Sequence, residues 1–434
     1  MKHRVIGFWA VCLLVWLLLP VSKVSLEESI VDFAGEVKLD LGSETLKQAV
    51  SVKTFVDGDT THFIVPESVH PSGVLKARFL ACNTPESTGK IEEWGKKASS
   101  FTREKLESAE EILVESDTDQ WNMDSTSTRC LVWVWYRPAG AEDFRNLNIE
   151  LLQNGLAAAN SSAQNRYGET CMAAIQQAKA QKLHIYSGEK DPDFFYGDAI
   201  ALTIRELRLH PEEYQGKKVA FQGVITMNYN NAVFIESFDE ESELYFGITA
   251  YYGFNMSGRG LDILSVGNEV KIVGTMQYYE AGQAWQVSGM TYRMMQPDDP
   301  DNILCLSEGN SPSWKETTAE MLLSQVTLPE EDGTKDYDYA FLALDTSVEM
   351  KGLRVQSVTP VQNEQGETGA NLLSCVSEDG KEVSVFVYPI KKDGGGNLTD
   401  QDFLNKTIDV RGIVEFKDGY RVCVFTKRGL TIQD

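Results

Sequence analysis

The pattern of apolar and polar positions divides the chain into a region of strands followed by helices and a later region of strands alone. In the first region, strands are predicted over residues 52–55, 62–65, 74–81, 112–114 and 131–136. The first two flank an Asp-Gly turn, which favours a hairpin. Helices are predicted over residues 92–108, 147–156 and 170–182. This order predicts a five-stranded OB-type barrel with three helices.

The later region contains an internal repeat. Residues 218–224 and 352–358 open two units with alternating strands, and residues 269–274 and 407–412 take matching places in them. Closing strands are predicted at residues 285–287 and 420–424. The segments before the units also correspond, because each has a short helix followed by residues 210–213 or 328–331. We predict two OB-like barrels, although a tandem β-sandwich would give the same local signals.

The N-terminal residues form a separate unit. Lys2, His3 and Arg4 precede an apolar run over residues 5–21, which favours an export signal. The run is short for a membrane span, which needs about 20 residues. The first alternative to a cleaved signal is an uncleaved N-terminal anchor, and the second is that the run has neither role. A signal or an anchor predicts an extracellular or cell-surface protein.

The predicted organisation is mainly β with α. Its segments are a signal peptide or N-terminal anchor (1–25), a spacer (26–43), the strand-then-helix domain (44–188), OB-like domain 1 (197–300), a helical and acidic linker (301–344) and OB-like domain 2 (345–434).

Charge and composition narrow the function. The 434 residues carry a net charge of −24, whereas a protein that binds nucleic acid over its whole surface is normally basic. Any polyanion must therefore bind at a local positive site. The seven cysteines form no CxxC pair and the five histidines no HxxxH or HExxH motif, so zinc spacing is absent.

The candidate chemistry is a set of acids, arginines and neutral oxygen donors between residues 57 and 129. Its members are Asp57, Asp59, Thr60, Arg78, Asn83, Thr84, Glu86 and Arg129. Clustered carboxylates can hold a hard cation and activate water, and guanidinium groups can neutralise a phosphate. Each residue alone has a plain structural explanation, such as the Asp-Gly hairpin turn. The residues mean more as a set, because adjacent strands can bring the Asp59 turn and residues 83–84 together around one cation.

Residues 44–188 resemble the calcium-dependent thermonuclease family. The resemblance rests on the Asp-Gly-Asp-Thr turn at 57–60, an arginine at 78 five residues before Asn-Thr-Pro-Glu at 83–86, Trp-Gly at 94–95, Arg129 before an apolar strand, and residues 154–157 and 178–187.

This resemblance implies a metal-dependent phosphodiesterase, an endonuclease that cleaves single-stranded DNA or RNA. It implies that Ca²⁺ is bound by the side chains of Asp59 and Asn83 and by the backbone carbonyl of Thr84. Glu86 would orient or deprotonate the attacking water. The two arginines, Arg78 and Arg129, would bind the phosphate and stabilise its transition-state charge.

Asp57 and Thr60 would support this site, and two features depart from the family. Asn83 stands where the family usually has Asp, which removes one negative charge and should lower the affinity for calcium. Residues 157–162 lack the family's base-stacking tyrosine. The alternative is therefore a weak or inactive scaffold that binds nucleic acid or protein.

The two C-terminal units are acidic and contain several aromatics. We expect accessory modules that position the nuclease or contact a cell-envelope protein or a polysaccharide, with membrane anchoring through residues 5–21 as a further expectation. Weak nucleic-acid binding is the remaining alternative.

Overall fold

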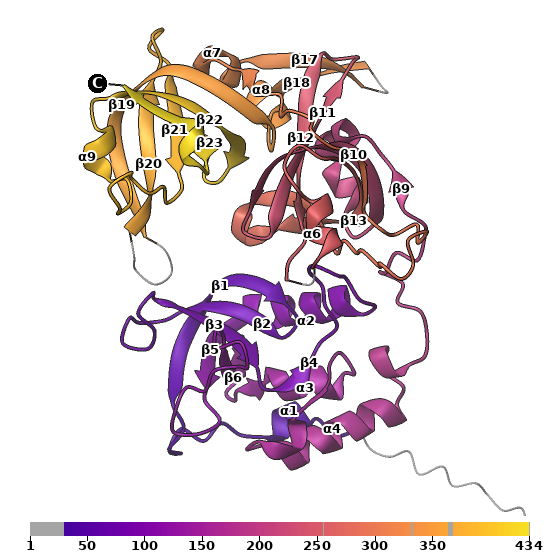
Figure 1. The fold of residues 1–434 in the computed structure, drawn as a ribbon. Helices are drawn as coiled ribbons and strands as arrows, with labels where there is room; N and C mark the ends of the chain where they lie inside the picture. The colour runs from indigo at the N-terminus through magenta and orange to yellow at the C-terminus, as the bar shows by residue number, and fades with distance from the viewer. Residues whose placement is uncertain (1–29, 255, 331–332, 363–367, 434) are drawn as a thin grey trace, which may run out of the picture. The chain divides into compact units, whose positions relative to one another are not determined.

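Strands make up more of the protein than helices do, as the fold class predicts (Figure 1). The computed structural model describes residues 30–254, 256–330, 333–362 and 368–433. The expected signal or anchor over residues 1–25 lies outside them. From Phe33 onward the chain forms one compact unit, and within the described residues no helix is long and apolar enough to cross a membrane.

The first barrel contains every strand predicted for its region. Its five strands are β1 (Lys47–Asp57), β2 (Thr60–Ile64), β3 (Val74–Phe79), β5 (Ala109–Glu115) and β6 (Cys130–Pro138). They pair in the order β3-β2-β1-β5-β6, and a parallel pairing between β3 and β6 closes the ring. Short strands flank it: β4 (Ala81–Asn83), β7 (Arg145–Asn146) and β8 (Ala158–Asn160).

All three predicted helices of this region are present. The helical elements are α1 (Phe33–Glu36), α2 (Gly95–Glu107), α3 (Leu147–Gln153), α4 (Gly168–Ala180) and the 3₁₀ turns η1 (Ser162–Gln164) and η2 (His184–Tyr186). Helix α2 starts later than predicted because residues 86–94 form a closed loop, in which the Glu92 N–H donates to the Glu86 carbonyl at 2.9 Å. Helix α3 begins where the Asn146 side chain accepts the Ile149 N–H at 3.0 Å.

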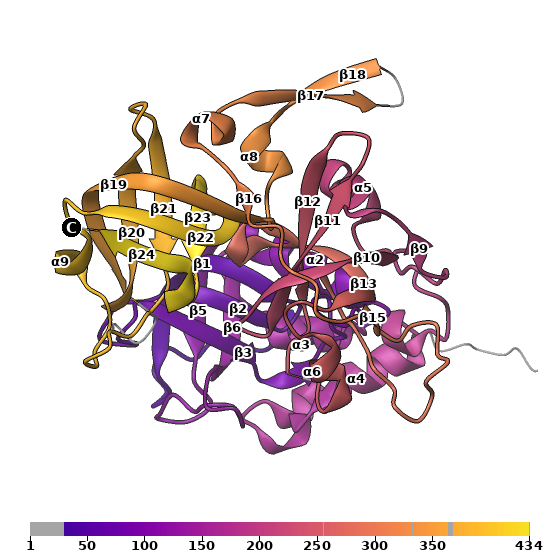
Figure 2. The same cartoon turned by 45° about the horizontal axis from the view of Figure 1, so that its top comes forward.

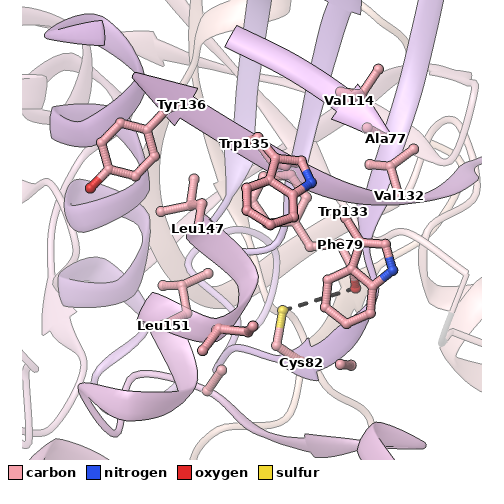
Figure 3. Close-up of a cluster of buried hydrophobic side chains, with 14 of the residues drawn as sticks. Ala77, Phe79, Cys82, Val114, Val132, Trp133, Trp135, Tyr136, Leu147 and Leu151 are labelled. Carbon is pink, nitrogen blue, oxygen red and sulfur yellow. Dashed lines mark hydrogen bonds between the residues drawn. The ribbon is translucent and has the colours of Figure 1, made fainter. Parts of the chain in front are cut away.

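The core of this domain lies between the barrel and helix α3 (Figure 3). Leu147 and Leu151 of α3 are fully buried, and so are Trp133 and Trp135 of β6. Figure 3 shows the two leucines on the side of the helix that faces these indoles. The Trp135 Nε1–H donates to Glu115 at 2.8 Å, which gives the buried indole the partner that it needs.

The second and third barrels form from the repeat. The second region comprises β9 (Ile200–Ala201), β10 (Lys218–Tyr229), β11 (Ala232–Asp239), β12 (Leu244–Tyr251), β13 (Glu269–Tyr279), β14 (Ala284–Ser288), β15 (Leu304–Ser307), α5 (Ile204–Leu209), α6 (Arg259–Ile263), η3 (Pro211–Tyr214) and η4 (Glu280–Gly282). The third comprises β16 (Lys315–Glu316), β19 (Ser347–Gln362), β20 (Thr368–Val376), β21 (Glu382–Val387), β22 (Thr407–Phe416), β23 (Tyr420–Val424), β24 (Leu430–Gln433), α9 (Asp400–Phe403) and η5 (Lys427–Gly429).

Both repeats close as barrels, so the tandem-sandwich alternative is wrong. The first strand pairs with the fourth in each, β10 with β13 and β19 with β22. The third pairs in parallel with the fifth, β12 with β14 and β21 with β23. Figure 2 shows β19 to β23 curving round to meet. The first barrel has the same connectivity, so one topology occurs three times along the chain.

The segment expected as a helical and acidic linker contains more strand than helix. Besides β15 and β16, it has a hairpin of β17 (Gln325–Glu330) and β18 (Gly333–Asp338), with short helices α7 (Ala319–Leu322) and α8 (Tyr339–Leu342). The predicted match between residues 210–213 and 328–331 is therefore wrong. Pro211 opens a 3₁₀ turn, whereas Pro329 lies in a two-stranded hairpin, where an edge strand tolerates proline.

Asn148 of α3 supports the closure of the first barrel. Its fully buried Nδ2–H₂ group donates to the carbonyls of Leu80 at 2.9 Å and Val132 at 3.0 Å, and its Oδ1 accepts the Val134 N–H at 2.8 Å. One amide thus satisfies three backbone groups where β3 and β6 meet.

We expect Asn148→Ala to lower the free energy of unfolding by about 2–4 kcal/mol, because buried backbone groups lose their partners. Urea titration followed by far-UV circular dichroism measures this change. Asn160→Ala, at an exposed position, is the matched control and should change stability little. Equal stability of the two variants would contradict this role for Asn148.

Candidate active site

The Asp-Gly-Asp-Thr turn joins β1 to β2, and helix α2 fixes its position. The Thr102 hydroxyl of α2 donates to the Gly58 carbonyl at 2.6 Å. A Cβ at Gly58 would lie 2.8 Å from Cγ2 of Thr84 and 2.9 Å from Cβ of Ala98. Only glycine therefore allows the turn to approach both the helix and residue 84 this closely.

Arg78 joins the turn to the segment after β3. It stands opposite Thr60 in the β2–β3 register, which places its guanidinium beside the turn. Its Nη1 donates to Asp59, and its Nη2 donates to Asn83 Oδ1 at 2.5 Å. The structure thus brings two of the predicted site residues, Asp59 and Asn83, into contact with a third, Arg78.

Asp59 is a fully buried carboxylate. Its Oδ2 accepts the Thr84 N–H at 2.8 Å, and Asp57 Oδ1 accepts the Asp59 N–H at 3.1 Å. Burial raises the pKa of Asp59 most, and the Asp57 carboxylate raises it further. The Arg78 charge only partly offsets these effects, and the resulting pKa is about 8.

Glu86 lies at the start of the closed loop that precedes α2. Its N–H donates to the Glu92 carboxylate at 3.2 Å, and a Cβ at Gly95 would lie 2.2 Å from its carbonyl oxygen. Partial loss of hydration and then the Asp57 charge raise the pKa of Glu86. The Arg78 and Arg129 charges both lower the pKa of Glu86, so both guanidinium groups lie within electrostatic range of this carboxyl group.

Arg129 immediately precedes β6 and is oriented by a residue that sequence analysis missed. Its Nε–H donates to Asp124 Oδ2 at 2.7 Å, and Thr126 Oγ1–H donates to Asp124 Oδ1 at 2.7 Å. Partial burial alone would raise the pKa of Asp124. The hydrogen bonds from Thr126 and Arg129 outweigh it and lower the pKa to about 2. The sequence signal is an aspartate that begins a polar turn five residues before the arginine.

The oxygen donors fit a hard cation by chemical type. Carboxylates of Asp57 and Asp59, the Asn83 amide oxygen and the oxygens of Thr84 are the ligands that Ca²⁺ prefers. The buried Thr84 Oγ1 has no hydrogen-bond partner among the described residues. Among all residues that the structure describes, no group of three or more His, Cys, Asp or Glu side chains is arranged to hold a metal. Arg78 already contacts Asp59 and Asn83, so a cation would compete with its guanidinium.

The segment that lacks the family's tyrosine is part of a small sheet. Residues 158–160 form β8, which pairs with β4, and Ser162 donates to the Ala81 carbonyl. This pairing holds the segment beside Asn83 without bringing an aromatic ring there.

Residues 76–188 match the family model described as staphylococcal nuclease homologue. The match includes Arg78, Asn83, Glu86 and Arg129, and the Asp59 turn precedes it. The predicted resemblance is therefore confirmed for this part of the chain. A search of curated proteins found no match to the chain.

The Asp124–Arg129 pair gives a pH prediction. Because the folded-state pKa of Asp124 lies below its ordinary value of 3.8, ionised Asp124 stabilises the fold above about pH 4 and loses this contribution as the pH falls toward about 2. We expect Asp124→Asn to be less stable than wild type at neutral pH, and the difference to shrink over that interval. Urea titrations across the interval measure it. The exposed Asp119→Asn variant should show no such convergence.

Proposed function

We propose that residues 44–188, which include the matched segment 76–188, form a Ca²⁺-dependent phosphodiesterase that cleaves single-stranded DNA or RNA as an endonuclease. The observation that carries this proposal is that Arg78 of β3 contacts Asp59 and Asn83 from two other segments, while the Arg78 and Arg129 charges both act on Glu86. Two cations beside a carboxylate of raised pKa are suited to binding a phosphodiester and activating water.

In this proposal Glu86 accepts the proton of the attacking water. A carboxylate with a raised pKa is a stronger base than an ordinary glutamate. Arg78 and Arg129 bind the phosphate oxygens, because guanidinium groups can donate two parallel hydrogen bonds to a phosphate. Asp124 orients Arg129 for this contact. The charge that develops on the phosphate during attack then faces two fixed cations.

Asp59, Asn83 and Thr84 would hold the calcium ion, with Asp57 nearby. A bound calcium ion would supply Lewis-acid polarisation of the phosphate and of a bound water. The high pKa of Asp59 reflects first its burial and then the adjacent Asp57 carboxylate, which the Arg78 charge only partly offsets. A cation at this place would stabilise both in their ionised form.

The proposed function also includes a cellular location and binding partners. We propose export on the basis of residues 1–25, with residues 5–21 as a signal or an anchor. The second and third barrels would be accessory modules that contact a cell-envelope protein or a polysaccharide. Their excess of acidic side chains disfavours binding of nucleic acid through released counterions.

A second candidate function is a scaffold of the same fold without catalysis. It is favoured by Arg78, which contacts both Asp59 and Asn83 and so acts as an internal cation. A site neutralised in this way could bind nucleic acid or protein without a metal. Strand cleavage and calcium binding separate the two candidates.

We expect the full chain to cleave single-stranded DNA or RNA with Ca²⁺ and not with a chelator. Glu86→Gln should reduce the cleavage rate roughly 100-fold or more because the general base is lost. Arg129→Ala should reduce it by a similar factor because a phosphate donor is lost. The assay measures release of labelled fragments under single-turnover conditions.

Glu110→Gln and Arg137→Ala are matched controls. These two side chains form an ion pair on strands β5 and β6, and their variants should keep the wild-type rate. Equal residual activity in wild type and in the Glu86 and Arg129 variants would indicate contamination and exclude the enzyme proposal.

Asn83→Asp should raise the affinity for Ca²⁺ by about tenfold, because it adds an anionic ligand. Isothermal calorimetry with and without a nucleotide 3′,5′-bisphosphate measures this change. Asn160→Asp, in the neighbouring β8, is the control for a general charge effect. An absence of heat with either ligand, in wild type and in Asn83→Asp, would favour the scaffold.

A further inference from the structure

A cavity of about 800 Å³ lies beside the candidate active site. Asn83 and Pro85, which flank Thr84 and precede Glu86, form part of its wall. The other walls come from the loop before α2, from Ala158 of β8 and from residues 184–194 after α4. Its volume is within the range of small-ligand sites, roughly 300–1,000 Å³, and is large enough for one nucleotide.

Two aromatic rings in the cavity wall are held in fixed positions. Trp94 and His184 meet edge to face, with ring centroids 5.1 Å apart. Each backbone has a positive φ, 68° and 39°, which is unusual for residues other than glycine. The backbone N–H of Trp94 donates to the buried Asp191 carboxylate at 2.6 Å, and His184 Nδ1 of the ring lies 2.7 Å from the Asn154 carbonyl oxygen.

The side chains of Trp94 and His184 remain partly accessible, although aromatic rings of this size contribute most to stability when buried. Phe194, also partly accessible, adds a third ring to the wall. The exposed Lys90 and Lys190 place two ammonium groups at the same cavity, which the acidic side chains of Glu92, Glu93 and Glu189 also line. The rings therefore carry the base recognition, and the lysines act only on the neighbouring phosphates. Rings for stacking beside cations for phosphates are the features by which proteins bind single strands.

We propose that this cavity is a nucleobase subsite, which binds the base of a nucleotide adjoining the phosphate at Arg78 and Arg129. Trp94 would provide the stacking face, and the lysines would contact the neighbouring backbone phosphates. The inference rests on the proposed nuclease function and names a part of its substrate contact.

This subsite accounts for a feature that the sequence leaves unexplained. Residues 157–162 provide no ring for base stacking, yet Ala158 of this segment lines a cavity whose wall contains the Trp94–His184 pair. Base binding would thus take place beside the loop of residues 86–94, which precedes α2. Because Glu86 belongs to that loop, a base in the cavity would also fix the strand beside the proposed general base.

The test measures binding without cleavage, in the full chain that carries Glu86→Gln. Fluorescence anisotropy follows labelled single-stranded oligonucleotides in which one abasic site is moved along the sequence. We expect one abasic position to weaken binding roughly tenfold, within the range that loss of one base–aromatic stack gives. Trp94→Ala should weaken binding of the intact strand by a similar factor and abolish sensitivity to that position.

Trp314→Ala is the matched control, because Trp314 also has a positive φ and is partly buried but does not line the cavity. It should keep the wild-type pattern of abasic sensitivity. Thermal melting checks that each variant folds. If Trp94→Ala does not fold, Phe194→Ala provides the same test from the segment after α4.

The results distinguish the subsite from the nuclease function. The subsite would be overturned if all abasic positions weakened binding equally. It would also be overturned if the folded Trp94→Ala and Phe194→Ala variants kept the wild-type dependence of binding on the abasic position. Failure of the strand to bind would overturn it as well. If one abasic position weakens binding but the wild-type protein never cleaves the strand, the subsite stands and the proposed nuclease activity is rejected.

Discussion

The candidate site depends on one electrostatic constraint: two carboxylates stand side by side in a place that water hardly reaches. Asp59 is fully buried and Asp57 nearly so, and both are fixed by a turn that helix α2 holds from behind. Like charges at low dielectric cannot both ionise without a nearby cation. Arg78 provides part of that positive charge in this structure, while Asn83 accepts from Arg78 and the Thr84 N–H donates to Asp59.

The barrel topology alone does not create this site. All three barrels share the same connectivity, yet the hairpin between the first two strands differs in chemistry. In the first barrel it contains the two aspartates, whereas in the second it contains Asn230 and Asn231, both at positive φ, as a tight hairpin turn prefers. The fold supplies a rigid hairpin, and the residues at its tip determine what the hairpin can bind.

Short-range patterns predicted many elements that depend on local periodicity, including the five strands of the first barrel, three strands in each of the other two barrels and the Asp-Gly turn. They did not identify Asn148, because its role arises only when α3 meets the closing strands β3 and β6. The hairpin at residues 325–338 was missed because acidic residues and Pro329 hid its alternation. The Trp94–His184 pair was missed for a related reason, since its members are distant in sequence and meet through Asp191 and Asn154.

Asn83 affects the net charge of the site and not only the number of anionic calcium ligands. The acids of the site are Asp57, Asp59, Glu86 and Asp124, and its cations are Arg78 and Arg129. When all are ionised, two negative charges remain uncompensated, which matches one divalent cation. An aspartate at position 83 would add a third negative charge and oppose an incoming phosphate. In a chain whose net charge is already −24, a neutral amide at this position reduces the local repulsion that a polyanionic substrate must overcome.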